Sequence, residues 1–324
     1  MHSITDLQAL IKNTFESASF SGQPAELYDP ITYTLNLGGK RIRPLLVLMG
    51  CEMFKGDIQK AEPALKAIEL FHNFTLLHDD IMDQAPLRRG KETVYKKWNT
   101  NVAILSGDAM FALACEYLAQ CEPDVLPLAL TTFTQTARMV CEGQQYDMNF
   151  ERLKVVSIND YLEMIRLKTA VLIGCSLKLG AILAKAPAAD TDKIWSFGEN
   201  IGMAFQLQDD MLDTFGDEKK FGKEIGGDIV SGKKTFLLLK AHELGSEKQR
   251  AYLDQLYSES KTNPKDKIEE VKKVFHELKI KEITLAEIDK YFNKALNSLE
   301  AIKVDKVRKG VLEQFARELL IREY

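Results

Sequence analysis

The stretch that decides the fold is Phe74-Thr75-Leu76-Leu77-His78-Asp79-Asp80-Ile81-Met82-Asp83. It begins as an apolar run typical of a helix and ends in three aspartates at positions i, i+1 and i+4. On an α-helix these positions fall within an arc of roughly 100°, so the three carboxylates point into one volume. Like charges this close resist ionising together unless a cation neutralises them, and oxygen ligands suit Mg²⁺ better than Zn²⁺. The alternative is a solvated helix end, because acidic triplets at such ends are common.

A second copy of the same spacing favours the metal interpretation. After another apolar run, the chain repeats Asp-Asp-x-x-Asp at Asp209, Asp210 and Asp213. Two such helices that face each other across a cavity would hold a cluster of Mg²⁺ ions, and a diphosphate is the obvious ligand for such a cluster. The sequence therefore predicts a metal site made by Asp79, Asp80, Asp83, Asp209, Asp210 and Asp213.

Composition limits the other possibilities. The 324 residues are 45% hydrophobic and 28% charged, as in an ordinary soluble globular protein. A net charge of −4 argues against nucleic-acid binding as the main activity. Five scattered cysteines without a Cys-x-x-Cys pair fit a reducing cytosol. The N-terminus has no signal-peptide pattern and no apolar run reaches the roughly 18 residues of a membrane span, so we expect a cytoplasmic protein.

The predicted fold is all-α. Apolar residues recur at helical spacing over long segments, and no segment alternates convincingly as a strand does. We expect helices over residues 5–18, 61–83, 101–121, 124–150, 157–185 and 190–213, followed by charged amphipathic helices. No linker composition divides the chain, so we expect one domain over residues 1–324.

Basic residues accompany the aspartates. Lys40 and Arg43 lie three apart beside a predicted helix N-terminus, where an anion is favoured, although a solvated basic turn is the alternative. Arg88 and Arg89 follow the first aspartate motif, and arginine offers the bidentate donors that suit phosphate. The glycine- and lysine-rich residues 216–235 follow the second motif and predict a lid rather than a plain surface loop.

Two further polar residues interrupt apolar helical segments. His72 lies on the same predicted helix as the first aspartate motif and could donate to an anion, although such a histidine is usually a core residue. Lys168 interrupts an apolar face and either extends to the surface or reaches into the cavity.

Taken together, these features resemble the trans-isoprenyl diphosphate synthases, or polyprenyl synthetases, over nearly the whole chain. The matching positions are 38–44, His72, Asp79–Asp83 with Arg88 and Arg89, Lys168 with Thr169, Gln206 with Asp209–Asp213, and Lys223 and Lys233. The resemblance implies the all-α isoprenoid synthase fold, a bundle of long helices around a central cavity. It also implies a homodimer and Mg²⁺-dependent prenyl transfer.

The family pattern assigns two diphosphate pockets. Isopentenyl diphosphate would bind, without metal, to Lys40, Arg43, His72 and Arg89. The allylic diphosphate would bind to Arg88, Lys168, Thr169, Gln206, Lys223 and Lys233. The catalytic groups would be Asp79, Asp80, Asp83, Lys168, Asp209 and Asp210, which assist loss of the allylic diphosphate before isopentenyl diphosphate attacks the cation. The departing diphosphate is the expected base, because no side chain stands out for that task.

Product length is expected to depend on the helix before Asp79. Phe71 and Phe74 are three apart and share a face, so the ring of Phe74 would form the floor of the cavity, with Phe71 roughly 4.5 Å deeper. The fourth residue before the motif is only Thr75, and the motif has no insertion. In the family this pattern is associated with geranylgeranyl diphosphate, and farnesyl diphosphate is the alternative.

Two other classes of protein share some of these features. A class I terpene cyclase shares the fold and the first motif, but its second metal motif normally mixes Asn, Ser or Thr, and Glu, and it needs no Lys40/Arg43/Arg89 pocket. A non-catalytic subunit usually loses one aspartate motif, whereas both are intact here.

Overall fold

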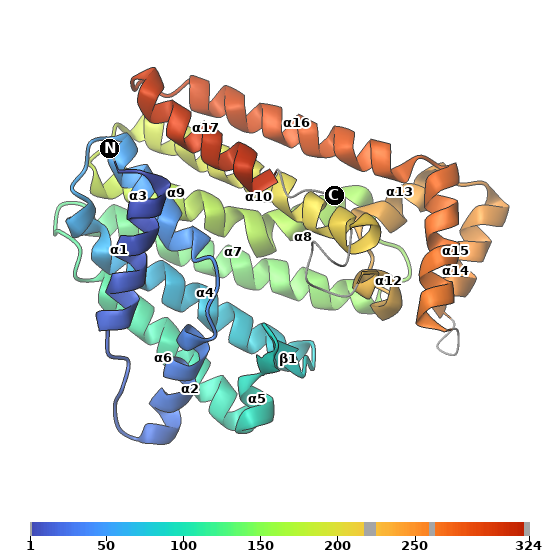
Figure 1. The fold of residues 1–324 in the computed structure, drawn as a ribbon, viewed down its shortest axis with the longest axis horizontal. Coiled ribbons are helices and arrows are strands. Elements are labelled where there is room, and N and C mark those ends of the chain that lie inside the picture. Colours follow the sequence, from blue (N-terminus) through green and yellow to red (C-terminus); the bar gives the residue numbers. More distant parts are fainter. Residues whose placement is uncertain (1, 217–224, 259–262, 321–324) are drawn as a thin grey trace. The chain divides into compact units, whose positions relative to one another are not determined.

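The computed structural model describes residues 2–216, 225–258 and 263–320, which are mainly helical (Figure 1). The α-helices are α1 (Ile4–Ser17), α2 (Ala25–Asn36), α3 (Ile42–Met53), α4 (Glu62–Met82), α5 (Val94–Lys97), α6 (Thr100–Leu118), α7 (Leu126–Arg152), α8 (Ile158–Ile165), α9 (Val171–Leu183), α10 (Ala188–Phe215), α12 (Gly227–Ser231), α13 (Phe236–Leu244), α14 (Glu247–Ser258), α15 (Pro264–Glu277), α16 (Ile280–Glu300) and α17 (Lys306–Leu320). The remaining elements are a 3₁₀ turn, η1 (Ile58–Ala61), a π-helical turn, η2 (Arg166–Ala170), and two short strands, β1 (Leu87–Arg88) and β2 (Lys91–Glu92). The all-α prediction is confirmed.

The chain divides into two compact units. The first contains residues 1–137 and 175–194, and the second contains residues 138–174 and 195–324. The boundaries fall inside α7, α9 and α10 rather than in loops. The expectation of a single domain over residues 1–324 stays a prediction.

In the first unit, α4 lies along α6 and also packs against α3 (Figure 1). Its inner face buries Leu65, Ile68 and Phe71, and each such side chain contributes about 1.5–3 kcal/mol when removed from water. The helix ends at Met82, with Asp83 as its C-cap. The predicted helix over residues 61–83 is therefore confirmed to within a residue at each end.

A tight hairpin follows α4 and was not predicted. Strands β1 and β2 pair antiparallel, and the two residues between them, Arg89 and Gly90, both have positive φ (54° and 75°). Two positive φ values in a two-residue loop are typical of the type I′ turn, whose twist matches that of the paired strands. This turn fixes the directions in which Arg88 and Arg89 leave the chain.

The segment predicted as one helix over residues 157–185 is divided by the π-turn η2, which lies in the second unit. A Cβ at Gly143 of α7 would lie 2.3 Å from the backbone nitrogen of Lys168, and one at Gly202 of α10 would lie 2.6 Å from Cα of Ala170. Two neighbouring helices thus approach the widened turn at glycines, where a side chain has no room. π-turns of this kind are frequent at functional sites.

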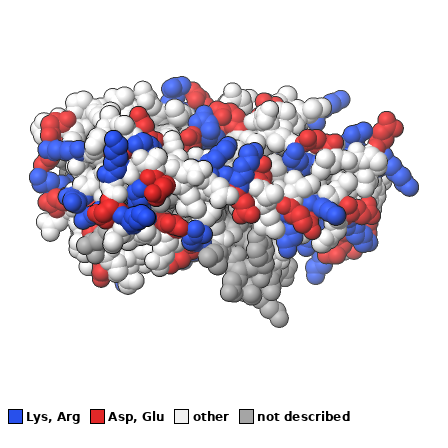
Figure 2. Space-filling model, turned by 90° about the horizontal axis from the view of Figure 1, so that it is seen from above, with Lys and Arg blue, Asp and Glu red and all other residues white. Residues whose placement is uncertain are grey.

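The surface carries both signs of charge. On the face seen in Figure 2, lysine and arginine are interspersed with aspartate and glutamate rather than gathered into a field of one sign. Within the described ranges, no helix combines the length and the apolarity that a membrane crossing needs.

Candidate active site

The first aspartate motif is fixed by the hairpin that follows it. Asp80 is 5% exposed, and Arg88 donates from Nε to both of its carboxylate oxygens at 2.9 Å. Nη2 of Arg88 lies 2.8 Å from Oδ1 of Asp80 and 3.6 Å from Oδ2 of Asp79. Burial raises the pKa of Asp80, and the hydrogen bond and charge of Arg88 lower it. Asp80, the middle aspartate of the motif, thus holds Arg88, which was predicted to bind the allylic diphosphate, beside the motif.

The other two carboxylates of this motif are more accessible. The side chain of Asp79 is 19% exposed, and Asp83 is an exposed residue at the helix C-cap. These two positions are four apart and lie on one side of α4. They are therefore better placed than Asp80 to share a ligand from outside the chain.

The predicted isopentenyl diphosphate pocket is assembled from three segments. Nη1 of Arg43, in the first turn of α3, lies 3.1 Å from Nε2 of His72 on α4. The guanidinium of Arg89 lies against Gly39, where a Cβ would come within 2.8 Å of its Cζ. Gly39 has φ +133°, which also favours glycine. Lys40 is exposed on the adjoining turn. The structure thus brings Arg43, His72 and Arg89 into one neighbourhood.

The charges of this pocket determine how His72 acts. Burial, followed by the charges of Arg43, Arg89 and Arg88, holds the pKa of His72 well below its usual value, so the imidazole is neutral near pH 7. Burial lowers the pKa of Arg43 to about 10, which still leaves it charged. Since arginine can only donate, Nε2 of His72 accepts and its Nδ1 carries the proton. That N–H is the donor that His72 can offer to an anion.

The second aspartate motif is fixed in a similar way, but by different donors. Asp210 is buried, accepts a short hydrogen bond from the hydroxyl of Tyr161 at one oxygen, and accepts from Nε2 of Gln206 at the other (3.1 Å). Oγ1 of Thr169 in turn donates to Oε1 of Gln206 at 3.2 Å. Thr169 and Gln206, predicted to touch the diphosphate, thus form a chain of hydrogen bonds that ends on Asp210.

The surroundings of Asp210 shift its pKa in opposite directions. Burial, followed by the nearby charge of Asp228, raises its pKa to about 7, while Lys233, Tyr161 and Gln206 lower it. Tyr161 itself has a pKa well above its usual value, first because of burial and then because of Asp210, so it remains protonated and donates.

The predicted lysines are paired with acids. Nζ of Lys168, in the π-turn, lies 2.5 Å from Oδ2 of Asp147 on α7. Nζ of Lys233 lies 3.9 Å from Oδ1 of Asp228, and the backbone N–H of Asp228 donates to Asp213. Lys223 and residues 217–224 of the predicted lid lie outside the described residues.

The two motifs suit Mg²⁺ only together with further ligands. Within the described parts of the chain, no three His, Cys, Asp or Glu side chains form a ready-made metal cage. Mg²⁺ usually takes one or two carboxylates and completes its shell with water and substrate phosphates. Such an ion requires accessible oxygen ligands, and the more exposed aspartates of the first motif, Asp79 and Asp83, offer them.

Comparison with known proteins identifies the family of the chain. The family model for polyprenyl synthetases matches residues 24–277. The chain belongs to the polyprenyl synthetase family. A geranylgeranyl pyrophosphate synthase of Geoglobus acetivorans is 40% identical over 246 residues, 75% of this chain and 77% of the relative. A solved structure described as geranylgeranyl pyrophosphate synthase is 43% identical, covers 100% of both chains and has a TM-score of 0.95.

A more distant structure was solved with bound ligands. The polyprenyl synthase of Caulobacter crescentus, solved in complex with calcium and isoprenyl diphosphate, is 26% identical, with a TM-score of 0.85 over 98% of this chain and 97% of that one. The prediction of the isoprenoid synthase fold is confirmed by these structures.

In this polyprenyl synthetase, the two phenylalanines proposed to limit product length belong to a larger aromatic cluster. The ring centroids of Phe71 and Phe74 are 5.6 Å apart. Phe111 of α6 lies 5.9 Å from Phe71 and 5.6 Å from Phe74, and Phe133 of α7 lies 5.3 Å from Phe71. Sequence spacing predicted the first pair, but only the packing of α6 and α7 on α4 could add the other two.

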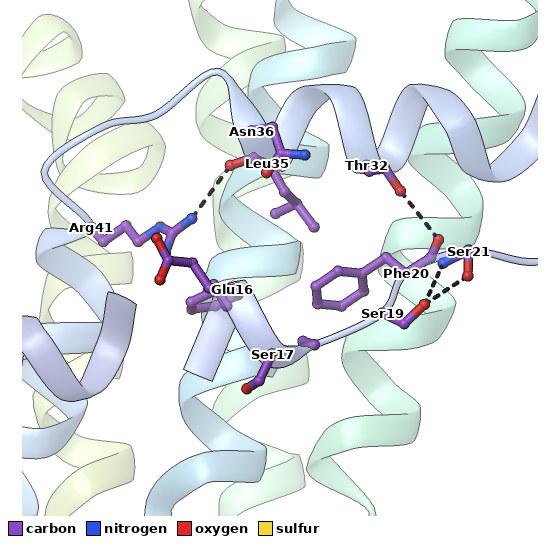
Figure 3. Close-up of a pocket in the computed structure, with 11 residues that line it drawn as sticks. Glu16, Ser17, Ser19, Phe20, Ser21, Thr32, Leu35, Asn36 and Arg41 are labelled. Carbon is purple, nitrogen blue, oxygen red and sulfur yellow. Dashed lines mark hydrogen bonds between the residues drawn. The ribbon is translucent and has the colours of Figure 1, made fainter. Parts of the chain in front are cut away.

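A separate cavity of about 300 Å³ lies at the end of α1 (Figure 3). The guanidinium of Arg41 stacks on Phe15 at 4.4 Å and its Nη2 lies 3.4 Å from the carbonyl oxygen of Leu35. In Figure 3 the side chains of Arg41 and Glu16 point toward one another. Arg41 is therefore occupied by α1 and α2, unlike its neighbours Lys40 and Arg43 in the family motif.

Sequence reasoning missed several residues of this site. They are Glu69, Asp147, Tyr161 and Asp228, in addition to Phe111 and Phe133. Glu69 could have been noticed as an acid within an apolar helical run, since buried acids are rare. Tyr161 and Asp147 gave no signal, because their partners Asp210 and Lys168 are distant in the sequence.

Proposed function

We propose that this chain is a short-chain trans-prenyltransferase that condenses isopentenyl diphosphate with an allylic diphosphate, with geranylgeranyl diphosphate as its main product. The observation that carries the proposal is the duplicated aspartate motif. In each copy the middle carboxylate is held by protein donors, Arg88 on Asp80 and Tyr161 with Gln206 on Asp210. The names of the relatives reported above support the product.

The residues of the two motifs would act on the allylic diphosphate. Asp79, Asp80, Asp83, Asp209, Asp210 and Asp213 would hold Mg²⁺, with Asp80 and Asp210 chiefly keeping the motifs in place. Bound Mg²⁺ supplies positive charge against the developing charge of the diphosphate leaving group. Arg88, Lys168, Thr169, Gln206, Lys223 and Lys233 would orient that diphosphate and stabilise its charge, since fixed donors cost no reorganisation during the reaction.

The second pocket would bind isopentenyl diphosphate. Lys40, Arg43 and Arg89 would neutralise its charge, and the neutral His72 would donate from Nδ1. Separate pockets orient the double bond toward the allylic carbon, so that the reaction proceeds within one complex rather than by random encounter. We also propose, from the family resemblance, that the enzyme is a homodimer and, from its scattered unpaired cysteines, that it is cytoplasmic.

The test is direct incubation of the purified full chain with isopentenyl diphosphate, a set of allylic diphosphates and Mg²⁺, followed by mass spectrometry of the products. A linear product with four isoprene units is expected, and chelation of the metal should abolish it. Farnesyl diphosphate as the end product would favour the alternative assignment of chain length. A cyclic hydrocarbon, or no turnover in a folded protein, would contradict prenyl transfer.

A further inference from the structure

A buried glutamate lies beside the proposed isopentenyl diphosphate pocket, and the mechanism above does not use it. Glu69 of α4 is 5% exposed and lies one helical turn before His72. Its Oε1 accepts from Nδ2 of Asn73 at 3.1 Å, and the same Nδ2 donates to the backbone carbonyl of Glu69 at 2.9 Å. Its Oε2 is buried without a hydrogen-bond partner among the residues that the structure describes.

The charges around Glu69 are positive. Arg41 and Arg43 at the start of α3 and Arg89 in the hairpin turn all act on its carboxylate, while His72 on its own helix is neutral. Burial raises the pKa of Glu69, and the hydrogen bond from Asn73 and the three guanidinium charges lower it. In the same neighbourhood Nε of Arg43 is also buried without a hydrogen-bond partner. The carboxylate therefore acts on these arginines through space rather than by a direct ion pair.

The contacts of Glu69 do not by themselves require a negative charge. A glutamine in the same position would offer the same oxygen to Asn73 and would fill nearly the same volume. What the carboxylate contributes, and an amide would not, is one negative charge that interacts through space with three arginines. A diphosphate that binds to Arg43 and Arg89 meets that charge as repulsion.

We propose that Glu69 is an internal counter-ion that limits the affinity of the cationic pocket for diphosphates. It offsets part of the positive charge that Arg43 and Arg89 present, so the pocket holds a diphosphate less tightly than its arginines alone would. This proposal rests on the proposed function for its ligand, isopentenyl diphosphate. The repulsion itself concerns any diphosphate in this pocket, including the inorganic diphosphate that prenyl transfer releases.

The size of the effect follows from charge and distance. At an effective dielectric constant of 20 or more, removing one unit charge from the surroundings of a bound anion changes its binding constant by on the order of tenfold. Mobile ions screen partly exposed charges, so the effect should shrink as ionic strength rises.

The experiment compares the wild type with E69Q. Binding of inorganic diphosphate is measured by calorimetry with a chelator present, and the KM values for isopentenyl diphosphate and for the allylic diphosphate are measured with Mg²⁺. E69Q should bind inorganic diphosphate about tenfold more tightly and lower the KM for isopentenyl diphosphate by a similar factor, with the allylic KM nearly unchanged. E69D, which keeps the charge, should not gain affinity.

E62Q is the matched control. Glu62 lies on the same helix, about 10 Å further from the pocket along the axis, and pairs with Lys66 at the surface. The same change of charge there should leave all three constants unchanged. Equal or weaker binding by E69Q would overturn the proposal, as would the same gain in E62Q. Failure of E69Q to fold while E69D folds would also overturn it, because the charge would then be needed for the fold.

A wild type that binds inorganic diphosphate but turns nothing over would contradict the proposed function and leave the comparison of affinities intact.

Discussion

Removing the ring of Phe74 should lengthen the product by at least one isoprene unit. Phe74 and Phe71 share one face of α4, and Phe71 lies roughly 4.5 Å further from Asp79 along the axis, a depth comparable with one isoprene unit. In the Phe74→Ala variant, Phe71 and Phe111 become the next barrier, because both contact the ring that is removed.

Two free energies decide the outcome: the folding stability that the substitution costs, and the hydrophobic free energy that a longer product gains in the vacated space. A buried phenylalanine changed to alanine costs about 3–5 kcal/mol of folding free energy, and Phe74, which is only partly buried, should lie near the lower end. A folded protein has roughly 5–15 kcal/mol to lose, so the variant should fold. Each buried methylene contributes about 0.8 kcal/mol, so roughly five further carbon atoms placed in the vacated space favour extension by about 4 kcal/mol.

The assay is product analysis by mass spectrometry with isopentenyl diphosphate in excess, and circular dichroism shows whether each variant is folded. Phe20→Ala is the control, because Phe20 stacks on Phe15 and meets Tyr117 edge to face, away from this cluster. Its product should match that of the parent. An unchanged product from a folded Phe74→Ala enzyme would refute Phe74 as the floor, and a longer product from Phe20→Ala would show that general loosening is enough.

Four further results are expected. Asp79→Ala should lose several orders of magnitude in kcat while the fold persists. Asp80→Asn should lose less activity, because its amide oxygen can still accept a hydrogen bond from Arg88. Equal losses of kcat in the two variants would contradict a metal-binding role for Asp79 and a positioning role for Asp80. Lys40→Ala should raise the KM for isopentenyl diphosphate, and Arg88→Ala the KM for the allylic substrate, so equal effects on both substrates would show that the pockets are not separable. Tyr161→Phe should lower kcat and raise the Mg²⁺ concentration needed for half-maximal activity, because it removes one of the two hydrogen bonds that the described residues donate to Asp210. An unchanged Mg²⁺ titration would contradict a positioning role. Burial raises the pKa of Glu69, so its ionisation should destabilise the fold progressively as pH rises from about 4.5 through the raised value; thermal melts of E69Q should lose less stability than wild type over that range.

The helices could be predicted from the sequence because their signal is local. Apolar spacing located α4 and α10 to within about two residues, since each buries one face. The hairpin after α4 was missed because strands of two residues have no alternation to detect, and Gly90 alone does not specify a turn. The π-turn at Lys168 was missed because apolar spacing continues through it.

The site, like the fold, contains residues that the sequence predicts and partners that it does not. Repeated aspartates and clustered basic residues were visible as spacing, and Arg43, His72 and Arg89 lie in one neighbourhood of the structure. Their partners were not visible, because a hydrogen bond such as that from Tyr161 to Asp210 joins residues that only the packed fold makes neighbours. A buried pair of this kind becomes predictable only when the depth of each helix in the core is known.

The two aspartate motifs divide their work in a way that helix geometry explains. Along a helix, positions i and i+4 differ by about 40° around the axis, whereas position i+1 lies about 100° from i. The outer pair, Asp79 and Asp83, therefore shares one face, and the middle residue Asp80 turns toward the protein, where Arg88 donates to it. In the second motif, Asp210 occupies that middle position and is likewise buried and held, by Tyr161. In both motifs the middle carboxylate thus joins the helix to a donor elsewhere in the chain, and in the first motif the outer pair is the more accessible one. Under the proposed function, this placement would leave little reorganisation to be done when charge develops on a leaving group.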